Sequence, residues 1–227
     1  MGLRILTNRV TDHAGDANEL AAIYTPPTTP WLRVNMVSTA DGAATGPNGL
    51  SGSINNEVDG RVFRLLRELA DVIVVGAGTA RAEGYQPAAK PIVLVSRSGE
   101  VPDSLRTATS GSVLMATTEA AAGTARQALG DDNILVLGGA VVDLALLKPA
   151  LAARGLPNIL CEGGQHLLTT LLAAGAVDEL CATTVPQLVG GPYRRITEGP
   201  AIDVPLELML LLEDAGTLIA RWFAQLA

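Results

Sequence analysis

The stretch Asp71-Val72-Ile73-Val74-Val75-Gly76-Ala77-Gly78-Thr79 contains four consecutive β-branched apolar residues that end at a glycine. A continuous apolar run of this kind is typical of a strand buried on both faces of a parallel sheet. The glycines allow a ligand to approach the backbone closely, and Thr79 could offer its hydroxyl and amide to a phosphate. We therefore expect a central strand that ends in a nucleotide-binding turn, with a plain connection as the alternative.

Strands and helices alternate along most of the chain. We expect strands at 32–38, 72–75, 92–95, 113–116, 134–137 and 159–161, and helices at 55–70, 119–129, 142–153 and 166–174. This alternation predicts a mostly parallel sheet with helices on both faces. Three more strands, at 179–185, 206–212 and 217–222, follow without helices and predict an antiparallel C-terminal part. The expected fold is a three-layer α/β/α domain over residues 1–227, with 1–30 as a lead-in before the ordered pattern.

Composition limits the possible partners and the location. The 227 residues carry a net charge of −7 and no run of Lys or Arg, which argues against nucleic-acid binding. No apolar run approaches the roughly 18–20 residues of a membrane helix, and the N-terminus lacks a signal-peptide pattern, so a cytoplasmic protein is expected. Cys161, Cys181, His13 and His166 show no ligand spacing, so no metal site is expected. We interpret both cysteines as small apolar residues in strands.

A second glycine turn follows another expected strand, in Cys161-Glu162-Gly163-Gly164-Gln165-His166-Leu167. Free N–H groups at the start of the following helix favour a pyrophosphate. Glu162 stands at the carboxyl end of its strand, where ligands of open α/β sheets bind, although a solvated carboxylate is the alternative. Neither turn has the spacing G-x-G-x-x-G, so a dinucleotide would be held in a different way.

Two further segments follow strands. In Ser38-Thr39-Ala40-Asp41-Gly42 we expect Asp41 to face the same cleft as Glu162, unless it only forms a turn. Ser96-Arg97-Ser98 follows the strand that ends at Val95, where a guanidinium fork and two hydroxyls suit the 2′-phosphate of NADPH. A solvated Arg97 in a turn is the alternative.

Five segments in this order, at 37–42, 51–52, 71–79, 162–164 and 185–191, resemble the reductase domain of the bifunctional riboflavin-biosynthesis deaminase-reductase. The likeness runs from about Trp31 to the C-terminus. It is closest to the stand-alone actinobacterial branch, in which Glu83-Gly84-Tyr85 replaces the usual acidic-x-Pro. The resemblance implies a dihydrofolate-reductase-like fold, NADPH as hydride donor, a homodimer, and a 5-aminouracil substrate that bears a phosphoribosylamino group.

The resemblance also implies roles for single residues. Ser51, Arg67 and Glu162 match substrate contacts, and Asp41 and Glu162 are the catalytic candidates. Asp41 would orient the substrate or favour its cationic imine form. The resemblance and the glycine turns together give the expected cofactor contacts, which are Ser53, Gly78, Thr79, Glu83, Ser96, Arg97, Gly163, Gly164, Gln165 and Leu167.

Two departures from the family bear on function. The chain has no H-x-E with a paired C-x-x-C, so no deaminase domain is expected. The usual Leu-x-x-Arg is also missing, and Pro87 and Lys90 stand at those places, where Lys90 could partly replace the arginine that helps to hold the substrate phosphate. Reduction of a pterin or dihydrofolate-like ring is therefore an alternative, and a non-catalytic dinucleotide-binding protein is an alternative of another class.

The segment 206–212 reads Leu-Glu-Leu-Met-Leu-Leu-Leu, which is too apolar for a solvated edge. Long apolar edges are usually paired or covered, and two-fold dimers are the commonest closed oligomers. The segment therefore predicts a homodimer formed partly by the C-terminal strands. Cover by a helix of the same chain is the alternative.

Overall fold

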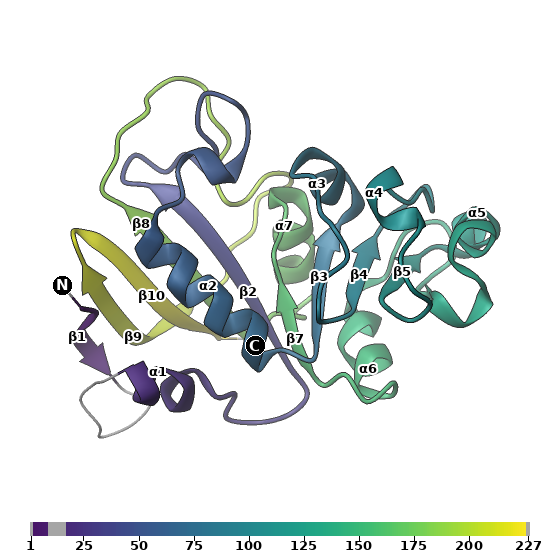
Figure 1. Ribbon diagram of the computed structural model, residues 1–227, viewed down its shortest axis with the longest axis horizontal. Helices are drawn as coiled ribbons and strands as arrows, with labels where there is room; N and C mark the ends of the chain where they lie inside the picture. Colours follow the sequence, from purple (N-terminus) through teal and green to yellow (C-terminus); the bar gives the residue numbers. More distant parts are fainter. Residues whose placement is uncertain (1, 9–16, 226–227) are drawn as a thin grey trace.

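The computed structural model describes residues 2–8 and 17–225, and these form a sheet of ten strands (Figure 1). The strands are β1 (Arg4–Asn8), β2 (Trp31–Thr39), β3 (Val72–Gly76), β4 (Ile92–Val95), β5 (Val113–Thr117), β6 (Ile134–Val136), β7 (Asn158–Cys161), β8 (Glu179–Val185), β9 (Leu206–Asp214) and β10 (Thr217–Ala224). The helices are α1 (Ala17–Tyr24), α2 (Glu57–Leu69), α3 (Ala77–Ala82), α4 (Asp103–Arg106), α5 (Glu119–Leu129), α6 (Leu147–Ala152) and α7 (Gln165–Ala173). The 3₁₀ turns are η1 (Ser51–Ser53), η2 (Asp131–Asn133) and η3 (Leu144–Leu146).

The strand order is β1-β9-β10-β8-β2-β7-β3-β4-β5-β6. Neighbouring strands from β8 to β6 are parallel, whereas β10, β9 and β1 join antiparallel. The predicted α/β fold, with a mostly parallel sheet and antiparallel C-terminal strands, is confirmed. The antiparallel pairing begins one strand later than expected, because α7 lets β8 return parallel to β2.

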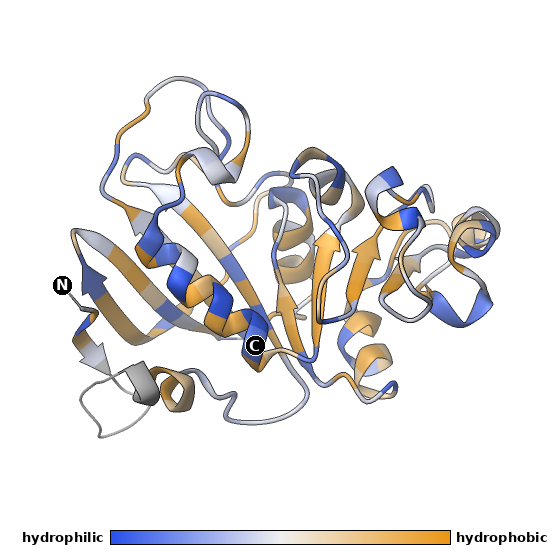
Figure 2. Ribbon diagram, viewed as in Figure 1, coloured by the Kyte–Doolittle hydropathy of each residue, from blue (hydrophilic) through white to orange (hydrophobic). Residues whose placement is uncertain are grey.

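Helices cover both faces of the sheet. On one face, α6 and α7 pack against alternate residues of β3, β5 and β7. On the other face, α3, α4 and α5 cover the β3–β6 half, and α1 and α2 cover the β8–β9 half. Figure 2 shows β3 and β4 as apolar along nearly their whole length, as expected for strands that are buried on both faces.

Helix α2 begins at a side-chain cap. The side-chain oxygen of Asn56 accepts a hydrogen bond from the Asp59 amide at 3.0 Å, so Asn56 rather than Asn55 is the cap. Val62 and Leu66 are buried against the sheet. Through these residues the helix packs on the sheet between β7 and β10.

Residues 1–30, expected as a lead-in before the ordered pattern, contain β1 and α1, so the ordered pattern begins before Trp31. β1 is short and pairs with β9, about two hundred residues later in the chain, so its local pattern gives little signal. The helix predicted at 142–153 is also wrong in part. Asp143 caps the 3₁₀ turn η3 by accepting a hydrogen bond from the Ala145 amide at 3.1 Å, and α6 begins only at Leu147.

The C-terminal strands do not form the expected apolar edge. β9 lies between β10 and β1, so a strand of the same chain covers it. On the three adjacent strands β1, β9 and β10, the exposed leucines are Leu6, Leu206 and Leu218. The buried cysteines agree with their interpretation as small apolar residues, and burial raises the pKa of Cys161 to about 12.

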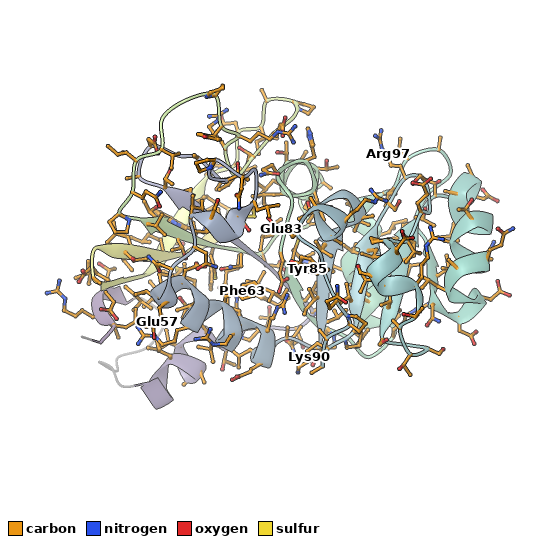
Figure 3. All side chains as sticks on the ribbon, turned by 45° about the horizontal axis from the view of Figure 1, so that its top comes forward. Glu57, Phe63, Glu83, Tyr85, Lys90 and Arg97 are labelled. Carbon is orange, nitrogen blue, oxygen red and sulfur yellow. The ribbon has the colours of Figure 1, made fainter. Side chains whose placement is uncertain are left out.

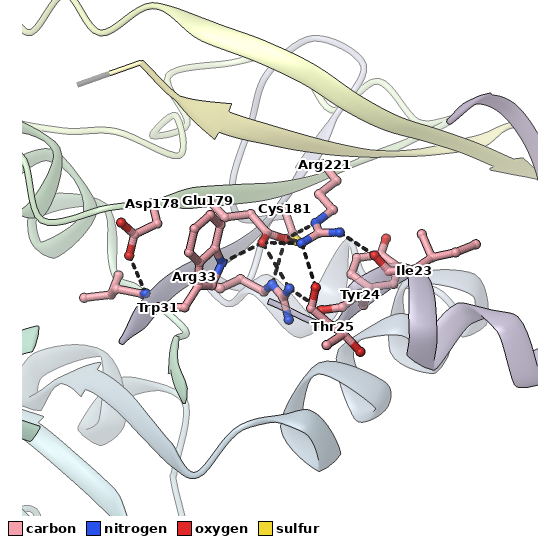
Figure 4. Close-up of polar contacts among 10 residues, drawn as sticks. Ile23, Tyr24, Thr25, Trp31, Arg33, Asp178, Glu179, Cys181 and Arg221 are labelled. Carbon is pink, nitrogen blue, oxygen red and sulfur yellow. Dashed lines mark hydrogen bonds and ion pairs between the residues drawn. The ribbon is translucent and has the colours of Figure 1, made fainter. Parts of the chain in front are cut away.

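A network of buried charges lies under α1, as Figure 4 shows. Glu179 at the start of β8 is fully buried and accepts hydrogen bonds from Arg33 Nε and Arg221 Nε, each at 2.7 Å, and from Trp31 Nε1 at 2.8 Å. Burial raises the pKa of Glu179, but the charges and hydrogen bonds of both arginines outweigh it and hold that pKa below its usual value. The arginines also donate to the carbonyls of Ile23 and Tyr24, so the network fixes the end of α1 on the sheet.

Candidate active site

The two predicted glycine turns meet at the carboxyl ends of β3 and β7. The Gly76 amide donates a hydrogen bond to the Gly163 carbonyl at 2.9 Å. A Cβ at position 164 would overlap the Thr79 hydroxyl oxygen, so Gly164 and Thr79 are in direct contact. The turns therefore form one surface, in which Thr79 leaves no room for a side chain at position 164.

Helix α7 starts at this surface. Gly164 is its N-cap residue and provides no side chain to cap the first N–H groups, which belong to Gln165 and the residues after it. Leu167 is buried in the core, so a cofactor could contact only its backbone. The helix N-terminus and the Thr79 hydroxyl together provide hydrogen-bond donors for an anion.

Farther along the sheet, a pocket lies at the carboxyl end of β4. Its lining includes Gly78, Arg81, Ser96, Arg97, Ser98 and Glu100. Arg81 and Glu100 lie 3.9 Å apart, whereas Arg97 pairs with no acid among the described residues. The pocket thus brings Gly78, Ser96 and Arg97 together as predicted, with an unpaired guanidinium at its rim (Figure 3).

Glu162 and Arg67 form an ion pair with two hydrogen bonds. Arg67 Nε and Nη2 donate to the two carboxylate oxygens of Glu162 at 2.7 Å each, and the Tyr85 hydroxyl donates to Glu162 Oε2 at 2.6 Å. The Glu162 side chain is only 2% exposed. The hydrogen bond to Glu162 raises the pKa of Arg67, and burial raises the pKa of Tyr85. A carboxylate has about four lone-pair positions, so Glu162 retains one for a ligand.

Two aromatic rings flank this ion pair. The Arg67 guanidinium carbon lies 4.6 Å from the centre of the Phe63 ring and 5.9 Å from that of Tyr85 (Figure 3). The sequence reasoning did not select Phe63 or Tyr85. The spacing of Phe63 and Arg67, four residues apart on α2, was a usable signal, because such residues share one face of a helix.

The other predicted residues lie in separate groups. The Ser51 amide donates to Glu83 Oε1 at 2.9 Å, which joins a predicted substrate contact to a predicted cofactor contact. The hydroxyl of Ser53 donates to the Leu50 carbonyl within its own turn at 2.8 Å. Lys90 Nζ donates to the Glu68 carbonyl at 3.2 Å, so its charge lies at the end of α2.

Asp41 holds a loop. Its carboxylate accepts hydrogen bonds from the Thr39 hydroxyl, the Gly190 amide at 2.7 Å and the Val189 amide at 3.2 Å. These donors, led by the Thr39 hydroxyl, lower the pKa of Asp41, so the group is ionised at neutral pH. Asp41 and Glu162 share no hydrogen-bond partner among the described residues. Asp41 therefore joins the end of β2 to the loop that follows β8.

The described part of the chain contains no group of three His, Cys, Asp or Glu side chains that could hold a metal ion. Within the same residues, every helix is too short or too polar to cross a membrane.

Comparisons with known proteins agree with this geometry. The model of the RibD C-terminal domain family matches residues 30–219. A 2,5-diamino-6-ribosylamino-4(3H)-pyrimidinone 5′-phosphate reductase of Methanothermobacter thermautotrophicus is 28% identical over 187 residues, which cover 77% of this chain and 86% of that protein. The reductase of the same name from Archaeoglobus fulgidus is 25% identical, covering 71% and 83%.

Solved structures show the same fold. A pyrimidine reductase-like protein from Corynebacterium diphtheriae superposes with a TM-score of 0.79 at 24% identity and covers 92% of this chain and 98% of its own. The riboflavin biosynthesis reductase Rib7 of Saccharomyces cerevisiae superposes with a TM-score of 0.65 at 16% identity, over 89% of this chain and 94% of its own. The arrangement of the sheet and the two glycine turns thus occurs on a scaffold shared with reductases.

Proposed function

The chain belongs to the RibD C-terminal domain family, and from this membership and the site geometry we propose that it is an NADPH-dependent reductase. Its proposed substrate is a phosphoribosylaminopyrimidine of riboflavin biosynthesis, of the 5-amino-6-(5-phosphoribosylamino)uracil type. The observation that carries the proposal is the meeting of the two glycine turns beside the Arg67–Glu162 pair. This arrangement offers a phosphate-binding surface next to a group suited to hold a polar ring.

The residues at the glycine turns and at the end of β4 fit a dinucleotide. Gly163, Gly164, Gln165 and Thr79 would hold the pyrophosphate through backbone and hydroxyl donors. Arg97 with Ser96 would take the 2′-phosphate, because a planar guanidinium matches a phosphate well. When bound, the reduced nicotinamide supplies the hydride, while the protein supplies orientation and electrostatics.

The substrate would lie along Arg67 and Ser51. Glu162 orients Arg67 through two hydrogen bonds, and its remaining lone pair can accept one donor of the pyrimidine. Asp41, which is ionised, would favour a cationic imine form of the ring-opened ribose. Correct alignment of donor and acceptor would then supply much of the rate.

One observation favours a second candidate, the reduction of a pterin or dihydrofolate-like ring. The family arginine that helps to hold the substrate phosphate is replaced by Lys90, whose amine is engaged by the Glu68 carbonyl. A substrate without a phosphate would not need that cation.

The test is oxidation of NADPH by the purified protein, followed by absorbance, with four substrates offered separately. These are the phosphorylated ribosylaminouracil, its dephosphorylated form, dihydrofolate and dihydrobiopterin. Turnover only with the phosphorylated pyrimidine supports the first candidate, and turnover only with a pterin or dihydrofolate supports the second. Tight NADPH binding without turnover of any substrate would contradict both and favour a dinucleotide-binding protein.

We also propose that the reductase is a single domain over residues 1–227, located in the cytoplasm and active as a homodimer. The exposed leucines Leu6 on β1 and Leu218 on β10 support the dimer, because they flank the same end of β9. Light scattering over a range of concentrations tests it. A mass that stays at that of one chain would contradict the dimer.

A further inference from the structure

An acid that neither the sequence motifs nor the proposed site uses lies in the first turn of α2. Asp59 is 2% exposed. The other described acids that are buried as whole residues, Glu179 and Asp214, bind Arg33 and Arg221 or Arg61. Asp59 forms no ion pair with any described residue, and its side-chain partner is the Thr183 hydroxyl on β8.

The surroundings of Asp59 disfavour its charged form. Burial raises its pKa, and the hydrogen bond from Thr183 opposes this only in part. The cations on the elements around it are engaged elsewhere: Arg221 of β10 and Arg33 of β2 by Glu179, and Arg61 of α2 by Asp214. Glu57, the other acid of this turn, is exposed. Asp59 is therefore a neutral acid over a wider pH range than an ordinary aspartate.

Asp59 belongs to the same ridge of α2 as the substrate-site residues. Asp59, Phe63 and Arg67 are spaced by four and so lie along one side of the helix, about 12 Å apart from end to end. The Arg67 end meets Glu162 after β7, and the Asp59 end meets Thr183 on β8. Because β2 lies between β7 and β8 in the sheet, the two ends of the ridge reach strands on either side of β2.

The strand pairing of β2 differs on its two sides below this ridge. β2 pairs with β7 only as far as Val34 and Cys161, although β2 continues to Thr39 along β8. Thr183, the partner of Asp59, stands opposite Val37 in this second half of β2. Asp59 is thus placed beside the stretch of β2 whose β7-side edge is free of strand pairing.

The other acids of the site have the opposite character. The Asp41 carboxylate accepts hydrogen bonds from three residues, and Glu162 accepts three from Arg67 and Tyr85. Both are held as acceptors, so neither is suited to give up a proton. Two kinds of carboxyl environment in one site are what acid–base chemistry at neutral pH requires.

We propose that the Asp59 carboxyl is the proton donor of this reduction site. The inference rests on the proposed function. In the step, the nitrogen of the substrate C=N bond takes the proton as the O–H bond of Asp59 breaks, which gives the cationic imine that Asp41 favours. The imine carbon then receives a hydride from the reduced dinucleotide, and the π electrons move to the nitrogen. The Thr183 hydroxyl holds the resulting Asp59 carboxylate until solvent restores its proton.

The test compares Asp59→Asn with Glu57→Gln, which removes an exposed acid from the same helical turn. In the wild type we expect the single-turnover rate to fall as pH rises through the pKa of Asp59. Asp59→Asn should lower the rate by roughly 10²–10⁴-fold, the usual contribution of a general acid, and should remove this pH dependence. Glu57→Gln should keep both the rate and the profile, and all three proteins should bind NADPH equally.

Two readouts do not depend on turnover. A protonated carboxyl stretch that persists above the usual pKa of an aspartate should appear in the infrared spectrum of the wild type and be absent from Asp59→Asn. Because the folded pKa is raised, the stability that Asp59 contributes is complete below the unfolded pKa of about 3.9 and is lost as pH rises through the folded value. The free energy of unfolding of the wild type should therefore fall relative to Asp59→Asn above that pH.

Thr183→Val is the second variant, in case Asp59→Asn does not fold. Losing a hydrogen bond that lowers the pKa should move the midpoint of the rate profile to higher pH. A normal rate and profile in Asp59→Asn, or an unmoved midpoint in Thr183→Val, would overturn the assignment of Asp59. A wild type that turns over no substrate would instead overturn the proposed function, and this inference with it.

Discussion

The β3–β6 half of the sheet and the β8–β1 half reach stability by different means. The strands of the first half are short, parallel and nearly all apolar, and a glycine turn follows β3. The second half is mostly antiparallel and buries Glu179 with two arginines. The first half offers backbone groups and turns to a ligand, whereas the second uses side-chain charges to hold α1 and the strands together.

This difference predicts where substitutions will act. A change at a glycine turn should alter ligand binding and leave folding intact. A change in the buried charge network should alter folding first, because an unpaired buried charge is costly.

The largest effect is expected for Glu179→Ala. It leaves Arg33 and Arg221 buried without their partner. Such a loss typically lowers the free energy of unfolding by about 3–5 kcal/mol. Urea denaturation measures it. Arg4→Ala is the matched control, since it breaks a surface pair with Glu213 and should cost about 1 kcal/mol or less. Equal losses in the two variants would remove the distinction between the halves.

Gly164→Val should weaken NADPH binding at least about tenfold, or roughly 1.4 kcal/mol, while the protein stays folded. The reason is steric: a side chain there overlaps the Thr79 hydroxyl and the space for a pyrophosphate. A positive φ does not contribute, because Gly164 has φ −79° and the positive value, 88°, belongs to Gly163. Isothermal titration measures the affinity. Gly123→Ala, in open space on α5, should bind NADPH as the wild type does, and equal affinity in Gly164→Val would contradict the pyrophosphate surface.

The same difference explains what the sequence could predict. β3 and α5 were predictable because a buried parallel strand and a capped helix are local patterns. β1 was not predictable, because its run of residues is short and its strand conformation depends on pairing with β9, which is distant in sequence. Glu179 resembles any acid at the start of a strand, and only Arg33 and Arg221, distant in sequence, make its burial possible.

Some contacts of the site could be predicted from local patterns in the sequence, and others could not. Gly163, Gly164, Thr79, Ser96 and Arg97 follow strand ends, and parallel strands bring their carboxyl ends to one edge of the sheet. The contact of Tyr85 with Glu162 depends on the path of the loop between α3 and β4, which no local pattern specifies.

Glu162→Gln tests a residue that follows β7, between the two halves of the sheet. It replaces an acceptor of Arg67 or Tyr85 by a donor, and a mismatched buried donor costs about 1–3 kcal/mol. We expect KM for the substrate to rise roughly 5- to 150-fold, with NADPH affinity unchanged. Steady-state kinetics beside a melting curve measure it. A lowered melting temperature with normal kinetics would make Glu162 a purely structural residue.

The smallest effect is expected for Arg97→Ala. Arg97 is exposed, so the melting temperature should not change. The ratio of NADH to NADPH dissociation constants should fall about tenfold, because a hydrogen-bonded charge at a phosphate contributes on the order of 1.5 kcal/mol or more. Titration with both dinucleotides measures it. An unchanged ratio would place the 2′-phosphate elsewhere.

Hydride transfer at the meeting point of the two halves is the central claim, and isotope transfer tests it most directly. NADPH carrying deuterium at one face of nicotinamide C4, and then at the other, is incubated with the protein and the phosphorylated ribosylaminouracil, and the product is examined by mass spectrometry. We expect the product to carry the deuterium from one of the two cofactors only, because the site fixes the face that meets the substrate. A reduced product without deuterium from either cofactor, or no reduced product although NADPH binds, would contradict the claim.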